Sequence, residues 1–458
     1  MPRRRIPCLL LLALMLLAGC VGRRPLPPTD DGDIRDVLAL PQNASAYLDP
    51  LTADLPLVPA GAQEEAARRF AAAWFAPWSA TAPRHSRDEA LWGLRAFAPG
   101  ATWGFNRRLL PAAELDALKA NADPDSYPNL LRPAIAVRNL SLRVLPTDEP
   151  LFQDFAKAGQ GFPFDLNQNT LAWDQTPLLA AHESADRAWL LVETPTAAGW
   201  VPARDVALCE PGFLRLFAGL RLAAVVREGL PLADPYGRFR LLARLGMALP
   251  LIGSDSGGRD VLLADRGLHG EAVPLFARLA PDAAAPLPLP LTPRAVAGLA
   301  DQLLGQPYGW GGLYGARDCS STLQDLFTPF GLLLPRNSAA QSRAGAAVDL
   351  KDLSPAAKEA AIAAHGVPFL SLLHRPGHIL LYLGQRGDPR GSRAVALHTV
   401  WGVRTTDFSG PTPGRKVVGR TVITTLAPGR ELARFDPAGE LLLGLDRLTL
   451  PLAAAPAR

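Results

Sequence analysis

The stretch 308–341 constrains the fold more than any other part of this sequence. It runs from a glycine-rich loop into a helix, and Cys319 stands where the loop becomes the helix. The apolar residues after the cysteine recur at the spacing that buries one face of a helix: Leu323, Leu326, Phe327 and Phe330. Asp318 directly precedes the helix, and a short acidic side chain there caps free backbone N–H groups. The helix dipole at this position favours a thiolate, which is the reactive form of cysteine.

Two later histidines are candidates for the base that a nucleophilic thiol needs. His378 and His398 lie in the apolar, strand-like runs GHILLYLG and AVALHTVWG. His378 would take the thiol proton and return it to the leaving amine, and His398 would orient His378 through the other ring nitrogen. The alternative is a buried structural cysteine with two packed histidines, which is the usual state of a lone free cysteine.

The surroundings of Cys319 resemble the NlpC family of bacterial cell-wall cysteine peptidases. The likeness rests on four ordered sequence elements: YGWGG at 308–312, DCS at 318–320, LPRNS at 334–338 with Gln341 nearby, and HILLYLG from His378. One departure is Ser321, where many family members have glycine. A serine fits the first turn of a helix without strain, so this departure does not weaken the predicted site.

The resemblance implies a papain-like α+β catalytic domain, with Cys319 on a helix packed against an antiparallel sheet that carries His378 and His398. It implies attack of the thiolate on an amide carbonyl, a thioester acyl-enzyme and its hydrolysis, with no metal and no cofactor. The backbone N–H of Cys319 is one natural donor to the oxyanion. The Tyr308 hydroxyl is a candidate for another hydrogen bond, although Tyr308 is also a plausible packing aromatic.

The resemblance also implies a substrate, the bond between γ-D-glutamate and a diamino acid in peptidoglycan stem peptides or muropeptides. Asp318 and Ser320 would then hold a free N-terminal L-Ala, because a carboxylate suits an ammonium group. Ser338 is expected to line the same pocket. Asp165 and Trp173 in the first predicted barrel are candidates for the pocket wall, although structural roles in that barrel explain both residues better.

Residues 1–20 have the features of an export signal. Three arginines precede an apolar run that is too short to span a bilayer, and Leu-Ala-Gly closes the run before Cys20. This resembles a bacterial lipoprotein signal, in which Cys20 is lipidated; the alternative is an ordinary secretory signal. We therefore expect an exported protein anchored to the membrane through the lipid on Cys20, at the periplasmic face of the outer membrane in a Gram-negative host.

A chain of 458 residues is too long for one core, so several domains are expected. The fold class predicted is multidomain, with a helical N-terminal segment, two small SH3-like β-barrels and the papain-like domain in that order. The predicted divisions are a signal peptide at 1–20, a polar tether at 21–45, a stabilising segment at 46–131, barrels at 132–208 and 209–280, a linker at 281–291, the catalytic domain at 292–430 and a tail at 431–458.

Charge and cysteine use exclude some functions. The net charge of +4 is weak for this length and no basic stripe occurs, so nucleic-acid binding is not expected. No cysteine and histidine spacing matches a zinc site. Cys209 is predicted to be a small buried hydrophobic residue.

Three functions remain open on the sequence. The first is a γ-D-glutamyl endopeptidase, and the second is another thiol amidase or acyltransferase on the same scaffold. The third is a non-catalytic, wall-binding lipoprotein, which the presence of Cys319, His378 and His398 disfavours. Nothing in the sequence separates the first two.

Overall fold

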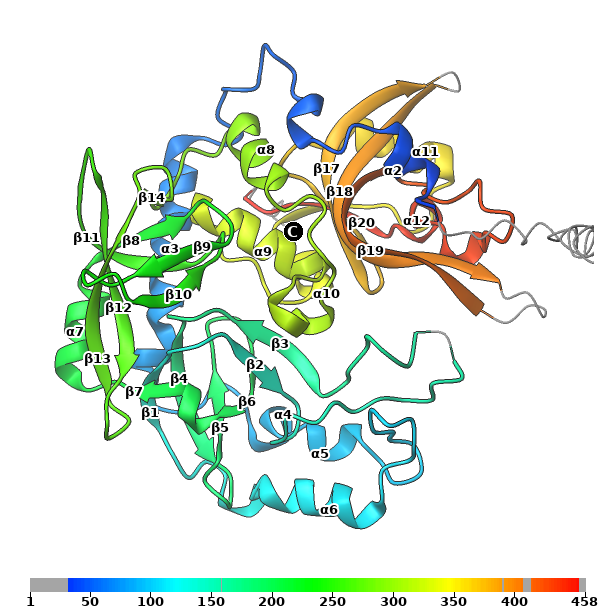
Figure 1. Ribbon diagram of the computed structural model, residues 1–458. Coiled ribbons are helices and arrows are strands. Elements are labelled where there is room, and N and C mark those ends of the chain that lie inside the picture. The colour runs from blue at the N-terminus through cyan, green and yellow to red at the C-terminus, as the bar shows by residue number, and fades with distance from the viewer. Residues whose placement is uncertain (1–31, 158, 389–390, 407–412, 453–458) are drawn as a thin grey trace, which may run out of the picture. The chain divides into compact units, whose positions relative to one another are not determined.

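The computed structural model describes residues 32–157, 159–388, 391–406 and 413–452 (Figure 1). Residues 34–458 form one unit, and the description that follows concerns this unit. The predicted signal peptide and its Cys20 lie outside the described residues.

The N-terminal part is helical, as its alanine-rich runs predict. Its elements are α2 (Arg35–Ala39), η1 (Ala44–Tyr47), α3 (Ala60–Ser79), α4 (Arg87–Ala90), α5 (Gly93–Ala96), α6 (Ala112–Asn121) and η2 (Pro124–Ser126). In α3, Phe70 and Trp78 are buried, and the Trp78 indole donates to the Ala134 carbonyl at 2.7 Å. This contact ties α3 to the first β domain.

The first β domain is an antiparallel sheet of seven strands in the order β3-β2-β6-β5-β4-β1-β7. Its elements are β1 (Arg132–Ala136), β2 (Leu140–Arg143), β3 (Gln168–Ala172), β4 (Pro177–Glu183), β5 (Trp189–Glu193), β6 (Ala198–Pro202), η3 (Ala203–Asp205) and β7 (Val206–Leu208). Leu142 on β2 and Val201 on β6 are fully buried in its core, as alternating apolar residues predict.

The second β domain begins with a helix that we did not predict. It comprises α7 (Pro211–Ala218), β8 (Arg221–Val225), β9 (Leu230–Ala233), β10 (Phe239–Ala243), β11 (Ala248–Asp255), β12 (Gly258–Arg266), β13 (Ala272–Leu279) and β14 (Ala284–Pro286). The predicted linker 281–291 is wrong in part, because β14 pairs with β8 and Leu291 is buried in the catalytic core. The segment is structured because it pairs with the free edge of β8. Its Pro/Ala composition does not indicate this pairing.

The C-terminal part is α+β. It contains α8 (Pro293–Asp301), η4 (Trp310–Gly315), α9 (Cys319–Phe327), η5 (Thr328–Phe330), α10 (Ser338–Gln341), β15 (Ala346–Asp349), α11 (Pro355–His365), β16 (Leu372–Arg375), β17 (His378–Asp388), β18 (Gly391–Thr406), β19 (Pro413–Thr425), η6 (Pro437–Gly439), α12 (Leu441–Gly444) and β20 (Arg447–Leu450). The strands form one six-stranded sheet in the order β15-β20-β16-β17-β18-β19.

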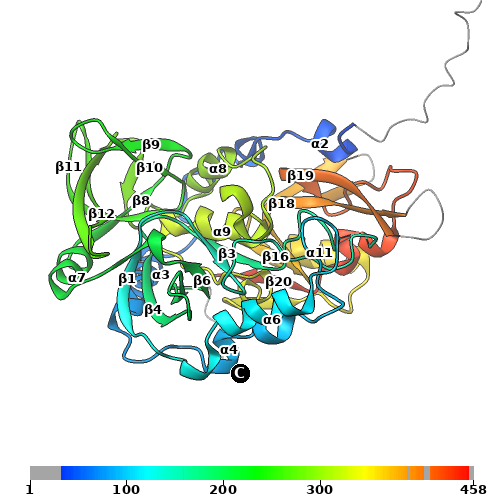
Figure 2. The same ribbon diagram turned by 60° about the horizontal axis from the view of Figure 1, so that its bottom comes forward.

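Alternating side chains cover the two faces of this sheet. On β17, Ile379 and Leu381 join the apolar cluster that contains α8 and α9, whereas Leu380 and Tyr382 join the cluster that contains α11 and α12. Figures 1 and 2 show α8 and α9 on one side of β17 and β18. The fully buried Leu326 of α9 lies in the same cluster, so the apolar face predicted for this helix packs on the sheet.

Two predicted boundaries are wrong at the ends of this unit. The predicted tether 21–45 is structured from Ile34, because Ile34 and Val37 are buried against β18 and β19. Its Asp36 carboxylate also accepts from the Thr425 backbone N–H at 2.8 Å. The predicted tail 431–458 contains β20, which lies between β15 and β16 inside the catalytic sheet. Both segments are short, and burial against distant strands makes them part of the fold.

Candidate active site

Cys319 is the first residue of α9, as the sequence predicts. Asp318 is its N-cap: Oδ1 accepts from the Ser321 backbone N–H at 2.9 Å, and the Ser321 hydroxyl accepts from the Asp318 N–H at 2.9 Å. This reciprocal capping box satisfies two backbone donors that a helix start leaves free. Ser321, which stands where many members of the family have glycine, therefore stabilises the start of α9.

The structure brings the two predicted histidines together and places Cys319 near the strand that carries His378. The backbone N–H of Ile379 lies close enough to the Cys319 sulfur to lower its pKa, so the sulfur lies near the start of β17, where His378 is the first residue. His378 Nε2 lies 2.8 Å from His398 Nδ1 on the neighbouring strand β18. His378 Nε2 is thereby occupied, so Nδ1 is the nitrogen left for the thiol.

Burial determines the charge of Cys319, His378 and His398 in the free enzyme. Burial, followed by the charge of Asp318, raises the pKa of the Cys319 thiol to about 12. Burial, followed by the charge of Arg375, lowers the pKa of His378 to about 3, and burial also lowers the pKa of His398 well below its ordinary value. The helix dipole favours a thiolate, but burial and the capping carboxylate act in the opposite direction on the pKa of Cys319. The resting pair is a neutral thiol beside a neutral imidazole.

We predict that alkylation of Cys319 by iodoacetamide accelerates steadily with pH. With the thiol pKa raised to about 12, the reactive thiolate fraction rises about tenfold per pH unit through neutrality. The measurement is the alkylation rate between about pH 5 and pH 9, followed by mass spectrometry of the Cys319 peptide. A rate that stays level across this range would instead indicate a preformed thiolate and imidazolium pair.

A cleft with a volume of about 350 Å³ opens at Cys319. All four predicted substrate-binding residues line it: Tyr308, Asp318, Ser320 and Ser338. Asp165 and Trp173 do not. The Asp165 carboxylate forms a buried ion pair with Arg143 at 2.9 Å, so it has a structural role in the first β domain.

Asp318 is held by Arg336, which belongs to the LPRNS element and had no predicted role of its own. Arg336 Nη2 lies 2.7 Å from Asp318 Oδ2, and Arg336 Nη1 donates to the Ser320 hydroxyl at 2.9 Å. Burial opposes ionisation of Asp318, but Arg336 outweighs it and holds the pKa of the carboxyl below its ordinary value. The carboxylate is charged in the cleft wall, and its Oδ1 already accepts from the Ser321 N–H, leaving Oδ2 as its less occupied oxygen.

Glycines let the loop before α9 meet the first β domain closely. Gly311 and Gly312 have φ values of +55° and +89°. A Cβ atom on Gly311 would lie 2.8 Å from the Gln168 carbonyl, and one on Gly312 would overlap Leu171. The YGWGG element therefore does more than allow a turn, because it seats the catalytic loop against β3.

Comparisons with known proteins agree with this architecture. Family models match the NLPC_P60 stabilising domain at residues 9–127, an SH3 domain of SH3b1 type at 150–202, an SH3 domain of SH3b2 type at 213–256 and the NlpC/P60 family at 305–388. The C-terminal part of the chain is therefore an NlpC/P60 domain. It is a cysteine peptidase with a stabilising domain, two SH3-like domains and a C-terminal NlpC/P60 domain. His398 lies beyond the matched stretch.

One solved structure shows the same fold over most of the chain. An NlpC/P60 endopeptidase from Photobacterium damselae subsp. piscicida is 22% identical, with a TM-score of 0.80 over 90% of this chain and 97% of that chain. An NlpC/P60 family protein from Bacillus cereus ATCC 10987 is 18% identical, with a TM-score of 0.42 over 62% of this chain and 82% of that chain. A search of the curated proteins finds no match.

The cleft is built by three of these domains. The stabilising domain contributes Trp92 and Phe97, and the SH3b1 domain contributes Gln168 and Asn169. Trp92 is 41% exposed despite its size. The expectation that an SH3-like domain borders the cleft is met by SH3b1, and the residues from the stabilising domain were missed because no local motif marks them.

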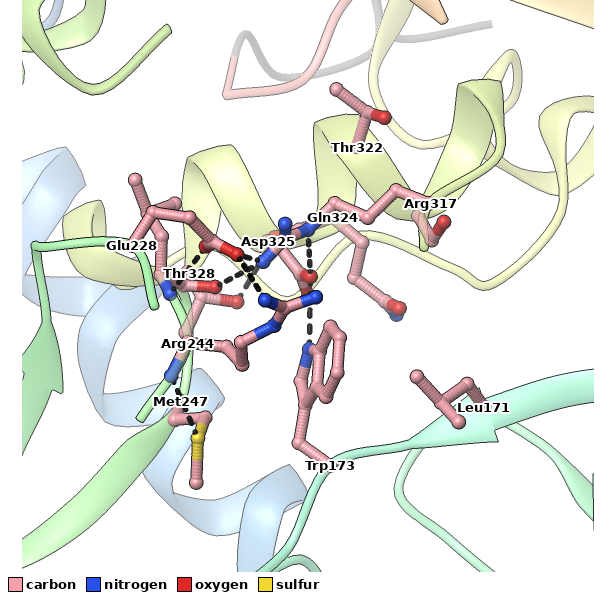
Figure 3. Close-up of polar contacts among 12 residues, drawn as sticks. Leu171, Trp173, Glu228, Arg244, Met247, Arg317, Thr322, Gln324, Asp325 and Thr328 are labelled. Carbon is pink, nitrogen blue, oxygen red and sulfur yellow. Dashed lines mark hydrogen bonds and ion pairs between the residues drawn. The ribbon is translucent and has the colours of Figure 1, made fainter. Parts of the chain in front are cut away.

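The SH3b2 domain contacts the NlpC/P60 domain through a buried ionic network (Figure 3). Arg317 donates through Nε to Asp325 Oδ2 at 2.6 Å and through Nη2 to Glu228 Oε2 at 3.0 Å. The Trp173 indole donates to the same Asp325 oxygen at 2.9 Å, and Arg244 pairs with Glu228 at 3.1 Å. The network thus joins SH3b1, SH3b2 and α9. Its central residue, Arg317, directly precedes the helix cap Asp318.

Two features are absent from the residues that the structure describes. No group of three or more histidine, cysteine or acidic side chains among them is placed to hold a metal ion. Within the same residues, no helix combines the length and apolar character that crossing a bilayer requires.

Proposed function

We propose that this NlpC/P60 peptidase hydrolyses the bond between γ-D-glutamate and a diamino acid in peptidoglycan stem peptides or muropeptides. The observation that supports this most is the hydrogen-bonded pair of His378 and His398 near Cys319, with Cys319 at a cleft that the stabilising and SH3b1 domains help to line. A cleft closed by neighbouring domains suits a short peptide end better than a long folded chain.

The geometry supports a general-base mechanism. His378 Nδ1 accepts the Cys319 proton as the sulfur attacks the amide carbonyl, and the Cys319 backbone N–H donates to the oxyanion. Collapse of the tetrahedral intermediate breaks the C–N bond, and the amine leaves with the proton from His378. Water, deprotonated by His378, then hydrolyses the thioester and returns the thiol. His398 keeps the imidazole of His378 oriented through the 2.8 Å hydrogen bond.

Asp318 is the proposed anchor for the free N-terminal L-Ala. Its carboxylate lines the cleft next to Cys319, and its pKa is lowered, so it is charged when an ammonium group approaches. Ser320, Ser338 and Tyr308 line the same cleft. Arg336 partly neutralises Asp318, which favours a second candidate function, a thiol amidase that does not need a free amine.

The proposed location follows from the sequence of residues 1–20. Lipidation of Cys20 would anchor the protein to the membrane, at the periplasmic face of the outer membrane in a Gram-negative host. This location would keep the peptidase beside the cell wall. Labelling with an alkyne-tagged fatty acid tests it, since Cys20→Ala should abolish the label.

The decisive experiment is digestion of the peptide L-Ala-γ-D-Glu-diaminopimelate by the protein lacking residues 1–20. We expect release of L-Ala-γ-D-Glu from the free peptide, and a loss of at least about tenfold in kcat/KM when the amine is acetylated, because an ion pair to Asp318 is lost. Products are measured by mass spectrometry.

Asp318→Asn is the matched variant, since Asn retains the helix-capping oxygen and removes the charge. It should lower the rate with the free peptide more than with the acetylated one. Equal cleavage of both peptides by the unmodified protein would eliminate the anchor and favour the amidase. Failure to cleave either peptide, with Cys319 still open to alkylation, would overturn the proposed substrate.

A further inference from the structure

A hydroxyl group ends the row of hydrogen bonds behind Cys319. His398 Nε2 lies 3.0 Å from Oγ1 of Thr424 on β19. The Thr424 hydroxyl in turn donates to the Thr425 backbone carbonyl at 2.7 Å. Thr424 is fully buried and His398 is 2% exposed, so this end of the row is shielded from bulk water.

These contacts determine where each proton lies. The hydroxyl of Thr424 has one proton, and the carbonyl of Thr425 takes it, so Oγ1 can only accept from His398. His398 therefore carries its proton on Nε2 and offers the lone pair of Nδ1. That lone pair accepts from His378 Nε2–H, and His378 Nδ1 is left without a proton.

We propose that Thr424 is a positioning residue that sets the tautomers of both histidines, so that His378 presents a proton acceptor to Cys319. Thr424 touches neither the nucleophile nor the substrate cleft, and it acts through His398. The inference rests on the proposed catalytic role of these histidines, and it concerns a residue that no motif in the sequence marks.

The surroundings of His398 Nε2 offer no substitute for this hydroxyl among the described residues. Beside His398 and Thr424 lies a small cavity of about 30 Å³, and its other walls include Ile34, Val400, Val403 and Leu441. A cavity with such an apolar lining tends to stay dry. The polar partner that fixes the tautomer is therefore Thr424 itself.

Loss of the Thr424 hydroxyl should allow His398 to adopt its other tautomer. With valine at 424, nothing favours a proton on His398 Nε2, and the form with the proton on Nδ1 becomes populated. In that form His398 donates to His378 Nε2, and the proton of His378 moves to Nδ1. An N–H then faces the Cys319 sulfur, and the base is lost in those molecules.

The test compares Thr424→Val, Thr424→Ser and Thr421→Val. Valine matches threonine in shape and removes the hydroxyl, whereas serine restores it. Thr421 is the matched control, because it is also buried on β19 and its hydroxyl bonds to Thr399 at 2.7 Å rather than to a histidine. Nitrogen-15 NMR of protein labelled at histidine reports the tautomers directly, with signals assigned from His378→Ala and His398→Ala.

We expect His398 to be protonated at Nε2 in the unmodified, Thr424→Ser and Thr421→Val proteins, and the Nδ1–H form to appear in Thr424→Val alone. With the peptide substrate, kcat should fall roughly tenfold in Thr424→Val with KM unchanged, as when other outer partners of functional histidines are removed. An unchanged tautomer in folded Thr424→Val would overturn the proposal. The NMR result holds whether or not the peptide is cleaved, so it is independent of the proposed substrate.

Discussion

Replacement of Cys319 by alanine is expected to lower kcat/KM for the stem peptide by roughly 10⁴-fold or more, as loss of a covalent nucleophile does in other hydrolases. The side chain lies at the cleft, beside His378, and no other cysteine among the described residues lines that cleft. His378→Ala should cause a loss of similar size, because nucleophile and base act as one unit. The measurement is product release under steady-state conditions, with folding checked by circular dichroism.

Cys209→Ala is the matched control for this prediction. Cys209 is 3% exposed and packs in an apolar cluster with Trp78, Phe213 and Phe217. Burial raises the pKa of its thiol, so the group is unreactive. Activity should survive this change. If Cys319→Ala retained activity, or if Cys209→Ala lost it in a folded protein, the assignment of the nucleophile would be wrong.

Arg317→Met is expected to lower the free energy of unfolding by about 3–5 kcal/mol, the largest loss of stability among the variants proposed for this protein. The Arg317 side chain is 4% exposed and pairs with two carboxylates, Asp325 and Glu228. Glu228 keeps Arg244 as a partner, but Asp325 would be left as a buried charge without a cation. Denaturant and thermal midpoints followed by tryptophan fluorescence measure the effect.

Two variants make the Arg317 prediction specific. Arg317→Met combined with Asp325→Asn should recover part of the loss, since asparagine removes the charge and keeps an oxygen for the Trp173 indole. Arg278→Met breaks two exposed ion pairs, with Asp255 and Asp260, and should change the midpoints little. Equal midpoints for Arg317→Met and the unmodified protein would show that the network does not hold the domains together.

The residues around Cys319 were predictable from sequence because their signals are local. The spacing of Leu323, Leu326 and Phe327 defines the buried face of α9, and Asp318 caps the helix as its residue type indicates. The continuous apolar run after His378 indicates a buried strand within a few residues. The helical segments, β-rich segments and α+β domain therefore appeared in the predicted order.

The charge state of the site was not predictable in the same way. The position of Cys319 at a helix start favours a thiolate, but its burial beside Asp318 raises the thiol pKa instead. Burial depends on which distant segments cover a residue, and one sequence does not report that. Trp92 in the cleft and Arg317 in the ionic network escaped notice for the same reason.

The sequence by itself determined the local elements: the capped helix that begins at Cys319, the strands that carry His378 and His398, and the order of the domains. Only the tertiary structure decided which distant pieces complete them. Ile34 packs on the edge of the catalytic sheet, β20 enters its middle and Thr424 ends the row of hydrogen bonds. The physical reason is that periodicity and capping act between near neighbours in the chain, whereas strand pairing, burial and tautomer choice depend on contacts between residues far apart in sequence.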